Sequence, residues 1–331
     1  MGAKRNLLVM LATVGVAVST FSGGVQASAK QTSPVPVQTD LGTFAAQGSG
    51  STVGPGGALY VTDGRAGRVL RVDPTTGAVS TFASGLPLSV APIGGAMDVA
   101  FRGQTGYVLV TLVGPFFGQT TVDGIYRIEK DGSHTVVADL GAWSTDHPPA
   151  TDFFIPSGVQ YALQSFRNGF LVTDGHHNRV LWVTLKGDIS ELIALDDIVP
   201  TGLEVSGNTV YVGQAGPVPH LPATGKVLSF GANAPAVSEV ASGASLIVDV
   251  GFGRGHQLYA LSQGSWDPAI PAIPANAGAP AAHNTGALVL VKDGGLPPVV
   301  GGLDQPTSLE FIGDSAFVIT LTGKVIRIDN V

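Results

Sequence analysis

Hydrophobic residues occur along this chain in short runs that are separated by Gly, Asp, Asn and Pro. Some runs alternate with polar residues, as expected for a strand with one buried face. Others, such as "VLVTLV" and "ALVLV", are continuous, which is typical of a strand that is covered on both faces. No stretch carries the period of an amphipathic helix, so the pattern predicts an all-β chain.

Two segments share one sequence frame. "YVTDGRAGRVLRV" at 60–72 and "LVTDGHHNRVLWV" at 171–183 both carry Val-Thr-Asp-Gly, three variable residues and Arg-Val-Leu, with Asp63 and Asp174 separated by 111 residues. The turn ends on Gly67 in the first segment and on Asn178 in the second, and both residue types tolerate a left-handed conformation. The frame therefore predicts a repeated hairpin in which only the three inserted residues are free to differ.

The repeat extends over most of the chain. Each unit has a second strand resembling "ALYVTDG", a third resembling "RVLRVD", a Gly/Asp turn and a fourth strand. The second-strand cores recur six times, at 59–61, 107–110, 170–172, 210–212, 258–260 and 317–319. Six such units predict an all-β, six-bladed β-propeller of four-stranded antiparallel blades.

The ends of the repeat indicate how the ring closes. The last unit has no fourth strand, and "VQTDLGTFAAQ" at 37–47 has the character of one, so we expect this segment to complete the last blade and remove an open sheet edge. The weakest expectation is the innermost strand of the first blade, "GSGSTVGPGG" at 48–57. Residues 37–331 are then a single propeller domain, preceded by a flexible lead-in at 30–36.

The N-terminal 29 residues have the pattern of a signal peptide. Lys4 and Arg5 precede an apolar run at 7–18, and small residues follow, with cleavage expected near Ala27 or Ala29. The run is too short to span a bilayer and no later run replaces it, so no membrane span is predicted. We expect a protein that is secreted, extracellular or cell-wall-proximal. The absence of cysteine excludes disulfides and lipid attachment through cysteine.

Composition adds a constraint on partners. The chain is 44% hydrophobic and 12% charged, which allows a large core. Without Lys4 and Arg5, 15 basic residues oppose 24 acidic ones, a formal charge of −9. This sign argues against nucleic acid or an anionic membrane as the main partner. We expect a monomer.

The signal peptide, the six-fold repeat and "GGALYVTDGRAGRVLRVDPTTGAVSTFASGL" together resemble the ScyD/ScyE family of secreted bacterial β-propellers, which are similar to NHL-repeat and gluconolactonase-type propellers. The resemblance covers essentially the whole mature chain. It implies the fold but no assigned reaction, because a fold does not fix a function. The chain keeps only "GPGG" of the family's first strand, "NPRGLAFGPDG", and we expect no role in making the pigment scytonemin.

Loop lengths indicate where a ligand would bind. The turns on one face of the propeller are short, whereas every long insertion falls on the other face, at 86–96, 113–123, 143–156, 214–224 and 262–286. Long loops without internal structure usually carry function. The sequence therefore predicts that a small molecule, glycan or protein binds on this face, around the mouth of the central channel.

Histidines concentrate on the same face. Five of the seven belong to it: His147, His176, His177, His220 and His283. His176, His177 and His147, with Asp174, are candidates for a metal or general acid/base cluster. The alternative is that they are loop residues and that Asp174 caps its own turn, as Asp63 does. The spacing matches no established zinc signature.

The first strand of each blade lines the axis and begins on the face with the long loops. This places Asp98 and Asp249 near the channel mouth, where two carboxylates would be candidates for calcium. The alternative is that they accept hydrogen bonds from the backbone of neighbouring blades. Resemblance to gluconolactonase propellers implies a glutamate in the first strand, and the 48–57 segment has none. Candidates for ligand contact are Asp98, Trp143, Asp152, Asp249, Trp266 and Arg65. We predict no cofactor, with calcium or zinc as the metals to be considered.

Two hypotheses of different classes follow. As a binding module, the protein holds its ligand on the loop-bearing face without turnover. As an enzyme, it is a metal-assisted hydrolase or lyase, lactonase-like, that uses His and Asp residues of the same face. The sequence leaves open whether the protein is an enzyme.

Overall fold

The structure is a computed structural model that describes residues 35–273 and 276–331. The expected signal peptide at 1–29 and most of the expected lead-in lie outside the described residues. Within them, no helix has both the length and the apolar character that crossing a membrane requires.

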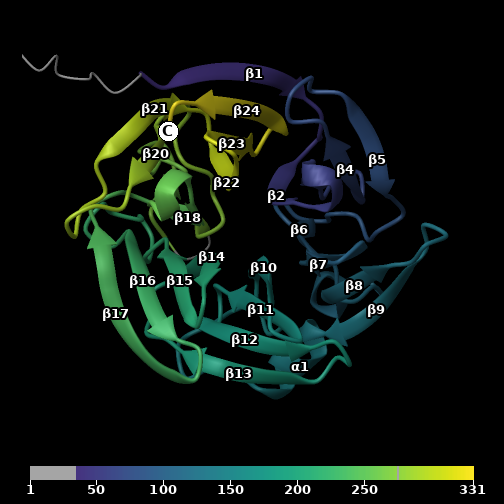
Figure 1. Cartoon of the computed structure of the whole chain (residues 1–331). Coiled ribbons are helices and arrows are strands. Elements are labelled where there is room, and N and C mark those ends of the chain that lie inside the picture. The colour runs from purple at the N-terminus through teal and green to yellow at the C-terminus, as the bar shows by residue number, and fades with distance from the viewer. Residues whose placement is uncertain (1–34, 274–275) are drawn as a thin grey trace, which may run out of the picture. The chain divides into compact units, whose positions relative to one another are not determined.

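Twenty-four strands form six four-stranded antiparallel sheets, arranged as blades around a central axis (Figure 1). The first three complete blades, each given from the inner to the outer strand, are β2 (Gly48–Val53), β3 (Leu59–Asp63), β4 (Arg68–Val72) and β5 (Val79–Ala83); β6 (Gly95–Arg102), β7 (Thr105–Thr111), β8 (Gly124–Ile128) and β9 (His134–Asp139); and β10 (Gln160–Phe166), β11 (Gly169–Asp174), β12 (Arg179–Thr184) and β13 (Ile189–Ala194).

The other three blades are β14 (Pro200–Ser206), β15 (Thr209–Gln214), β16 (Lys226–Gly231) and β17 (Ala234–Ser242); β18 (Ile247–Phe252), β19 (Leu258–Ser262), β20 (Gly286–Leu290) and β21 (Pro298–Leu303); and β22 (Pro306–Ile312), β23 (Ser315–Thr320), β24 (Lys324–Asp329) and β1 (Val37–Thr43). The six-bladed prediction is confirmed.

The last blade contains both ends of the propeller. Strand β1 pairs antiparallel with β24, from Val37 opposite Asp329 to Thr43 opposite Lys324. This confirms that the N-terminal strand closes the ring. The segment expected to be weakest forms a regular inner strand, β2, whose Ser51 pairs with Val61 of β3.

Each blade is covered on both faces by its neighbours, as the continuous apolar runs predicted. In β3, Tyr60 packs with Val108 of the following blade, whereas Leu59 and Val61 pack with Phe317 of the last blade. Successive side chains of a strand point to opposite faces. Both faces of β3 are therefore buried in the hydrophobic core.

The repeated hairpin frame is also confirmed. Gly67 and Asn178 have φ values of +58° and +53°, and Asp63 and Asp174 each accept a backbone N–H within their own turns. The chain departs from an all-β pattern at α1 (Leu140–Asp146), which is capped by the Asp139 carboxylate accepting the Ala142 N–H. Among the elements that lie wholly in the described residues, single 3₁₀ turns also occur at η1 (Pro55–Gly57), η2 (Pro115–Phe117) and η3 (Arg254–His256).

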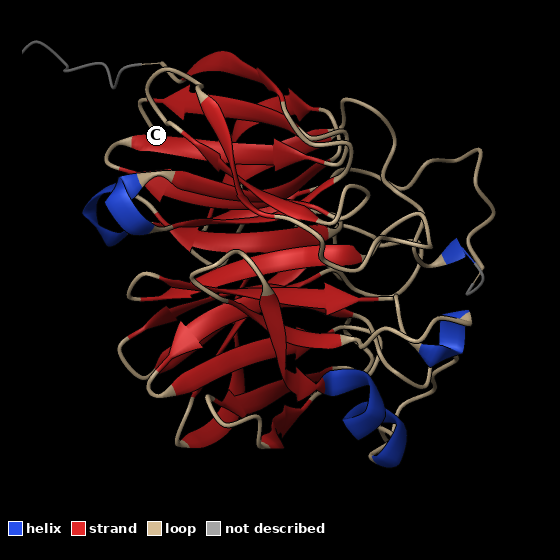
Figure 2. Cartoon of the chain, turned by 90° about the vertical axis from the view of Figure 1, so that its right-hand side faces the viewer, coloured by secondary structure: helices blue, strands red, loops and turns tan. Residues whose placement is uncertain are grey.

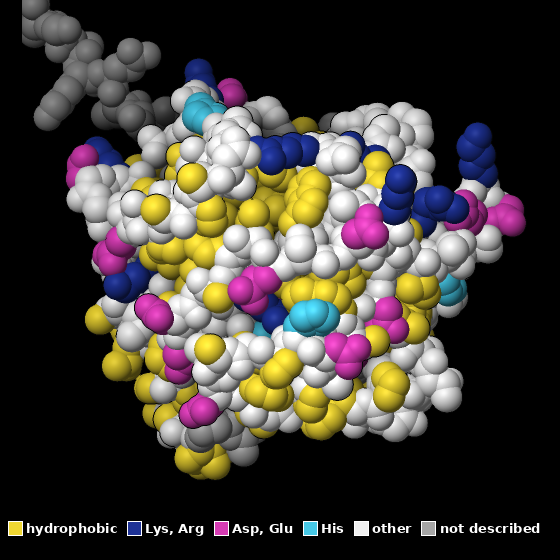
Figure 3. Space-filling model, turned by 90° about the horizontal axis from the view of Figure 1, so that it is seen from below, with side chains coloured by type: hydrophobic (Ala, Val, Ile, Leu, Met, Phe, Trp, Pro, Cys, Tyr) yellow, Lys and Arg dark blue, Asp and Glu magenta, His cyan; other side chains and the backbone are white. Residues whose placement is uncertain are grey.

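The two ends of the channel differ. Figure 2 shows that the longer connections project from one side of the stack of strands, as the loop lengths predicted, while short turns close the other. Figure 3 looks at the outer side of the ring, where acidic, basic and hydrophobic side chains are interspersed. We call the side with the long connections the loop face.

Ring closure can be tested by truncation. A chain beginning at residue 44 loses β1 and leaves β24 as an open edge, with six paired positions unfilled. We expect its free energy of unfolding in urea to fall by about 3 kcal/mol or more, because each backbone hydrogen bond contributes roughly 0.5 kcal/mol or more. The matched control begins at residue 35. Equal unfolding midpoints for the two chains would contradict the closure role.

Candidate functional site

A cavity of about 130 Å³ lies where the channel opens on the loop face, and we call it the mouth cavity. Every inner strand contributes one residue to its wall: Ser49, Met97, Tyr161, Thr201, Val248 and Thr307. Residues 277–280 of the long β19–β20 loop complete the wall, with further apolar side chains including Leu246 and Leu321. Six separate strands therefore define one site.

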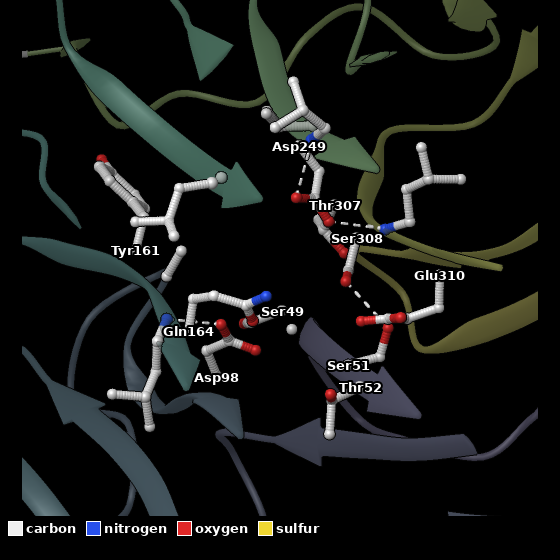
Figure 4. A pocket seen from close by; sticks show the side chains of 18 of the residues that line it. Ser49, Ser51, Thr52, Asp98, Tyr161, Gln164, Asp249, Thr307, Ser308 and Glu310 are labelled. Atoms are coloured by element: carbon white, nitrogen blue, oxygen red, sulfur yellow. Dashed lines mark hydrogen bonds between the residues drawn. The ribbon is translucent and has the colours of Figure 1, made fainter. Parts of the chain in front are cut away.

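A second, smaller cavity of about 50 Å³ lies next along the channel, and we call it the inner chamber (Figure 4). Its lining includes four carboxylates from four different inner strands: Asp98, Glu204, Asp249 and Glu310. Ser49, Tyr161, Val248 and Thr307 line both cavities, so the mouth cavity and the inner chamber adjoin.

Asp98 and Asp249 have the same role in blades on opposite sides of the ring. Asp98 accepts the Leu163 N–H of the next blade at 2.7 Å, and Asp249 accepts the Leu309 N–H of the next blade at 2.7 Å. Each also accepts the N–H of its own following residue. These are the contacts that the hydrogen-bonding alternative describes, and the two side chains line the inner chamber rather than the mouth cavity.

Glycine makes room for each of these aspartates. A Cβ at Gly50 would lie 2.3 Å from Oδ1 of Asp98, and a Cβ at Gly202 would lie 2.2 Å from Oδ1 of Asp249. Such distances are far below van der Waals contact. Each aspartate thus needs a glycine in the preceding blade.

Calcium and zinc are the candidate metals that the sequence suggests for Asp98 and Asp249. Across the described parts of the chain, no three His, Asp or Glu side chains lie close enough together to hold one metal ion. Calcium requires six to eight oxygen ligands and zinc about four ligands. Asp98 and Asp249 therefore do not provide the ligand set of a calcium or zinc centre.

Burial shapes the electrostatics of the inner chamber. Loss of hydration raises the pKa of Asp249 to about 7 and raises the pKa values of Asp98 and Glu310 well above their ordinary range. Burial also raises the pKa of Glu204. For Glu310, the nearby charge of Asp249 adds to the shift. A cation in the chamber would favour the ionised carboxylates.

The catalytic candidates of the sequence lie together on the loop face, beside β11. Asp174 is fully buried and accepts the backbone N–H of Val159 and the Nε–H of Arg179, the latter at 3.3 Å. Nδ1 of His177 accepts a hydrogen bond from Arg179 at 2.9 Å, and its Nε2 donates to the Ile155 carbonyl at 3.0 Å. His177 therefore holds the 143–156 loop to its blade, and Asp174 reaches the same loop through Ser144, whose hydroxyl donates to it at 3.5 Å.

The other two histidines have similar contacts. Nε2 of His176 accepts the N–H groups of Phe154 and Ile155 at 2.9 and 3.0 Å, and burial lowers its pKa to about 4. Nδ1 of His147 donates to the Trp143 carbonyl at 2.8 Å, and the two rings stack at 4.3 Å. Among the described lining residues of the two channel cavities, His147, Asp174, His176 and His177 do not occur.

The remaining ligand-contact candidates are spread over the loops. The Trp143 ring lies 4.8 Å from the guanidinium of Arg179. Trp266 donates its indole N–H to the Ile270 carbonyl. Arg65 and Asp152 are exposed, in the β3–β4 and β9–β10 connections. The structure thus places only Asp98 and Asp249 of this set in the channel.

A histidine that the sequence did not single out lies in the mouth cavity. His220, on the β15–β16 loop, is 4% exposed, and its Nδ1 lies 2.7 Å from the Gly216 carbonyl. Because a carbonyl only accepts, Nδ1 carries the proton and Nε2 of the neutral ring keeps its lone pair. Burial lowers the pKa of His220, against a smaller opposite effect of carbonyls that include those of Gly216 and Ala277. The ring is therefore neutral at pH 7.

The backbone at His220 is also unusual, with φ at +55° in a residue other than glycine. Such a conformation persists only where surrounding contacts fix it. In the sequence, the only indication of a role for His220 is its position in a long loop of the loop face. That signal did not distinguish it from the four other histidines of the face.

Comparison with solved structures supports the same architecture. A gluconolactonase from Xanthomonas campestris is similar over 88% of this chain and 89% of its own, with a TM-score of 0.60 and 14% identity. A luciferin-regenerating enzyme gives a TM-score of 0.58 at 11% identity, covering 89% and 95%. Virginiamycin B lyase from Staphylococcus aureus gives 0.52 at 13%, covering 89% and 98%.

No family model matches the chain, and no curated protein matches it either. The solved neighbours are six-bladed propellers of the gluconolactonase and virginiamycin B lyase type, and they include a lactonase and a lyase. At these identities the likeness shows the fold.

The raised pKa of Asp249 predicts a pH effect on stability. The unfolded carboxyl ionises near 3.8, whereas the folded one keeps its proton up to about 7, so the folded state binds more protons between these values. This group therefore stabilises the fold at low pH, and its contribution is lost as the pH rises through about 7.

We expect Asp249→Asn to reduce the fall in unfolding free energy over this pH range, as measured by urea titrations at several pH values. Asp293→Asn, at an exposed turn, is the matched control. The same pH slope in wild type and Asp249→Asn would rule the assignment out.

Proposed function

We propose that the protein acts on a small molecule bound in the mouth cavity, as a lactonase-like hydrolase or a lyase. The observation that carries the proposal is a cavity walled by all six inner strands with a neutral imidazole, His220, in its lining. The solved neighbours include a gluconolactonase, a lyase and a luciferin-regenerating enzyme, and this favours an enzyme over a module that only binds.

His220 would act as the general base. For a lactone, water adds to the carbonyl carbon while Nε2 takes the proton of the water, the ring C–O bond breaks, and the released oxygen receives that proton. For a lyase, Nε2 removes a proton from carbon, the electron pair of that C–H bond forms a new double bond to the neighbouring atom, and the leaving group on that atom departs with its own bonding electrons. Both schemes need a neutral imidazole, and burial keeps His220 in that state.

A second candidate is binding of a small molecule, glycan or protein without turnover. It is favoured by the contacts of Asp174, His176 and His177, because these side chains bind Ser144, Phe154 and Ile155 of the 143–156 loop. Membership of the ScyD/ScyE family and secretion after cleavage near Ala27 or Ala29 belong to the proposal too, and both rest on sequence motifs.

The enzymatic proposal is tested with His220→Gln. We expect the purified protein to open γ-butyrolactone or δ-valerolactone, followed as acid release in a pH-stat. The variant should lose about 100-fold or more in kcat/KM, as is usual when a general base is removed. The matched control is His283→Gln, on the neighbouring loop, where the exposed imidazole pairs with Asp304 at 2.8 Å.

Melting temperatures of the two variants would show that each is folded. A His220→Gln enzyme with wild-type kcat/KM would contradict the role of His220. No lactone opening above the buffer rate, with a lactone still raising the melting temperature of the wild type, would favour the binding candidate instead.

A further inference from the structure

The channel changes in polarity along its axis. The mouth cavity is bordered largely by apolar groups, among them Met97, Val199, Leu246 and Val248. The inner chamber next to it contains the four carboxylates. Among the described residues that line either cavity there is no Lys or Arg, and the one histidine, His220, is neutral at pH 7. A ligand entering from the loop face therefore meets an apolar wall and then a chamber lined by acidic groups.

We propose that the ligand of the mouth cavity is an organic ammonium compound, whose apolar body fills the mouth cavity and whose charged nitrogen points into the inner chamber. The proposal rests on the site of the proposed function and names the class of molecule bound there. It does not depend on whether the molecule is converted.

Hydrogen bonding supports this orientation. An ammonium group offers only donors, and a carboxylate offers only acceptors. Asp98 and Asp249 are held by backbone N–H groups, and Glu204 accepts from Nε2 of Gln164 at 3.0 Å. Figure 4 shows the carboxyl group of Glu310 facing the chamber beside Ser51. Glu310 takes a backbone hydrogen bond from Val53 and still presents its carboxyl group to the chamber, so it is well placed to receive a donor from a ligand.

The size and shape of the two cavities also fit. A water molecule takes up about 30 Å³, so the inner chamber, at about 50 Å³, has room for one ammonium group. The mouth cavity, at about 130 Å³, has room for a small ring. Tyr161 borders both cavities, and an aromatic ring beside a cation adds an attraction of its own.

Other ligand classes fit less well. An anion would bring a negative charge beside four acidic groups whose own ionisation burial already opposes, and a neutral molecule would bring no charge that favours their ionised forms. An inorganic cation would leave the apolar mouth cavity unfilled, and in the described residues no three carboxylates converge on one point as a metal site requires.

Three small probes of similar shape test the proposal by calorimetry: benzylamine, benzyl alcohol and benzoate. We expect benzylamine to bind at least about 10-fold more tightly than benzyl alcohol, equivalent to about 1.4 kcal/mol, and benzoate to bind more weakly than either. Glu310→Gln should weaken benzylamine binding about 10-fold and leave benzyl alcohol binding within about 2-fold.

The matched control for Glu310→Gln is Glu239→Gln, which removes a carboxylate from the outer strand β17, where it pairs with Lys226 at 2.6 Å. Its benzylamine affinity should equal that of the wild type. If the Glu310 variant fails to fold, the wild-type protein still provides a test through pH.

Protonated chamber carboxyl groups should release protons when the ammonium binds. The groups facing the chamber are Asp98, Glu204, Asp249 and Glu310, and burial raises the pKa of each. Wild-type affinity for benzylamine should therefore rise from about pH 6 to about pH 8, across the Asp249 pKa of about 7, while that for benzyl alcohol stays constant. Heats measured in buffers of different ionisation enthalpy should show the proton release.

Benzyl alcohol or benzoate binding as tightly as benzylamine would overturn the proposal. So would a Glu310→Gln variant that keeps wild-type affinity for benzylamine, a pH-independent affinity, or displacement of benzylamine by excess CaCl₂ but not by choline chloride of equal ionic strength. Benzylamine binding without lactone opening would count against the proposed enzyme alone. Lactone opening without selective benzylamine binding would count against this inference alone.

Discussion

No blade of this propeller can bury both faces of its sheet alone, so the structure depends on closure of the ring by β1 against β24. Strand β3 illustrates the constraint, because Tyr60 needs the following blade and Leu59 needs the last blade to be covered. An open ring would expose one face of each terminal blade and one unpaired edge. Closure also brings all six inner strands to a single axis, and the mouth cavity exists only because they meet there (Figure 1).

Polar contacts between blades fix the inner strands at close range. Thr62 and Thr173 donate their hydroxyls to carbonyls of the next blade, at Met97 and Thr201, and Thr201 in turn donates to Ile247. Asp98 and Asp249 add cross-blade bonds of the same kind to backbone N–H groups. Several residues in these contacts between blades, namely Met97, Thr201, Asp98 and Asp249, also line the channel cavities. The hydrogen bonds that hold neighbouring blades together therefore also position the residues of the candidate site.

Much of this architecture could be predicted from the sequence, because it follows from local chemistry that repeats. The "VTDG" frame needs a left-handed residue at Gly67 and Asn178, and apolar runs need covering sheets. The depth of a residue along the channel could not be predicted in the same way. A bulge near the start of most inner strands, as between Ala96 and Asp98, shifts the phase and moves Asp98 into the inner chamber.

Long loops were the least predictable part. Helix α1 is short and carries no repeated apolar period, and its start depends on the Asp139 cap. The sequence grouped five histidines on the loop face, yet contacts distant along the chain decide their roles. His177 turns towards Arg179 and the 143–156 loop, whereas His220 lies beside Gly216 in the wall of the mouth cavity.

The claim that ligands enter the channel mouth is tested most directly by a crystal structure of the protein grown with benzylamine. The account predicts electron density for the ring in the mouth cavity beside Tyr161, with the nitrogen directed towards Glu310. Density beside His176 and His177 at the 143–156 loop, with an empty mouth cavity, would contradict it.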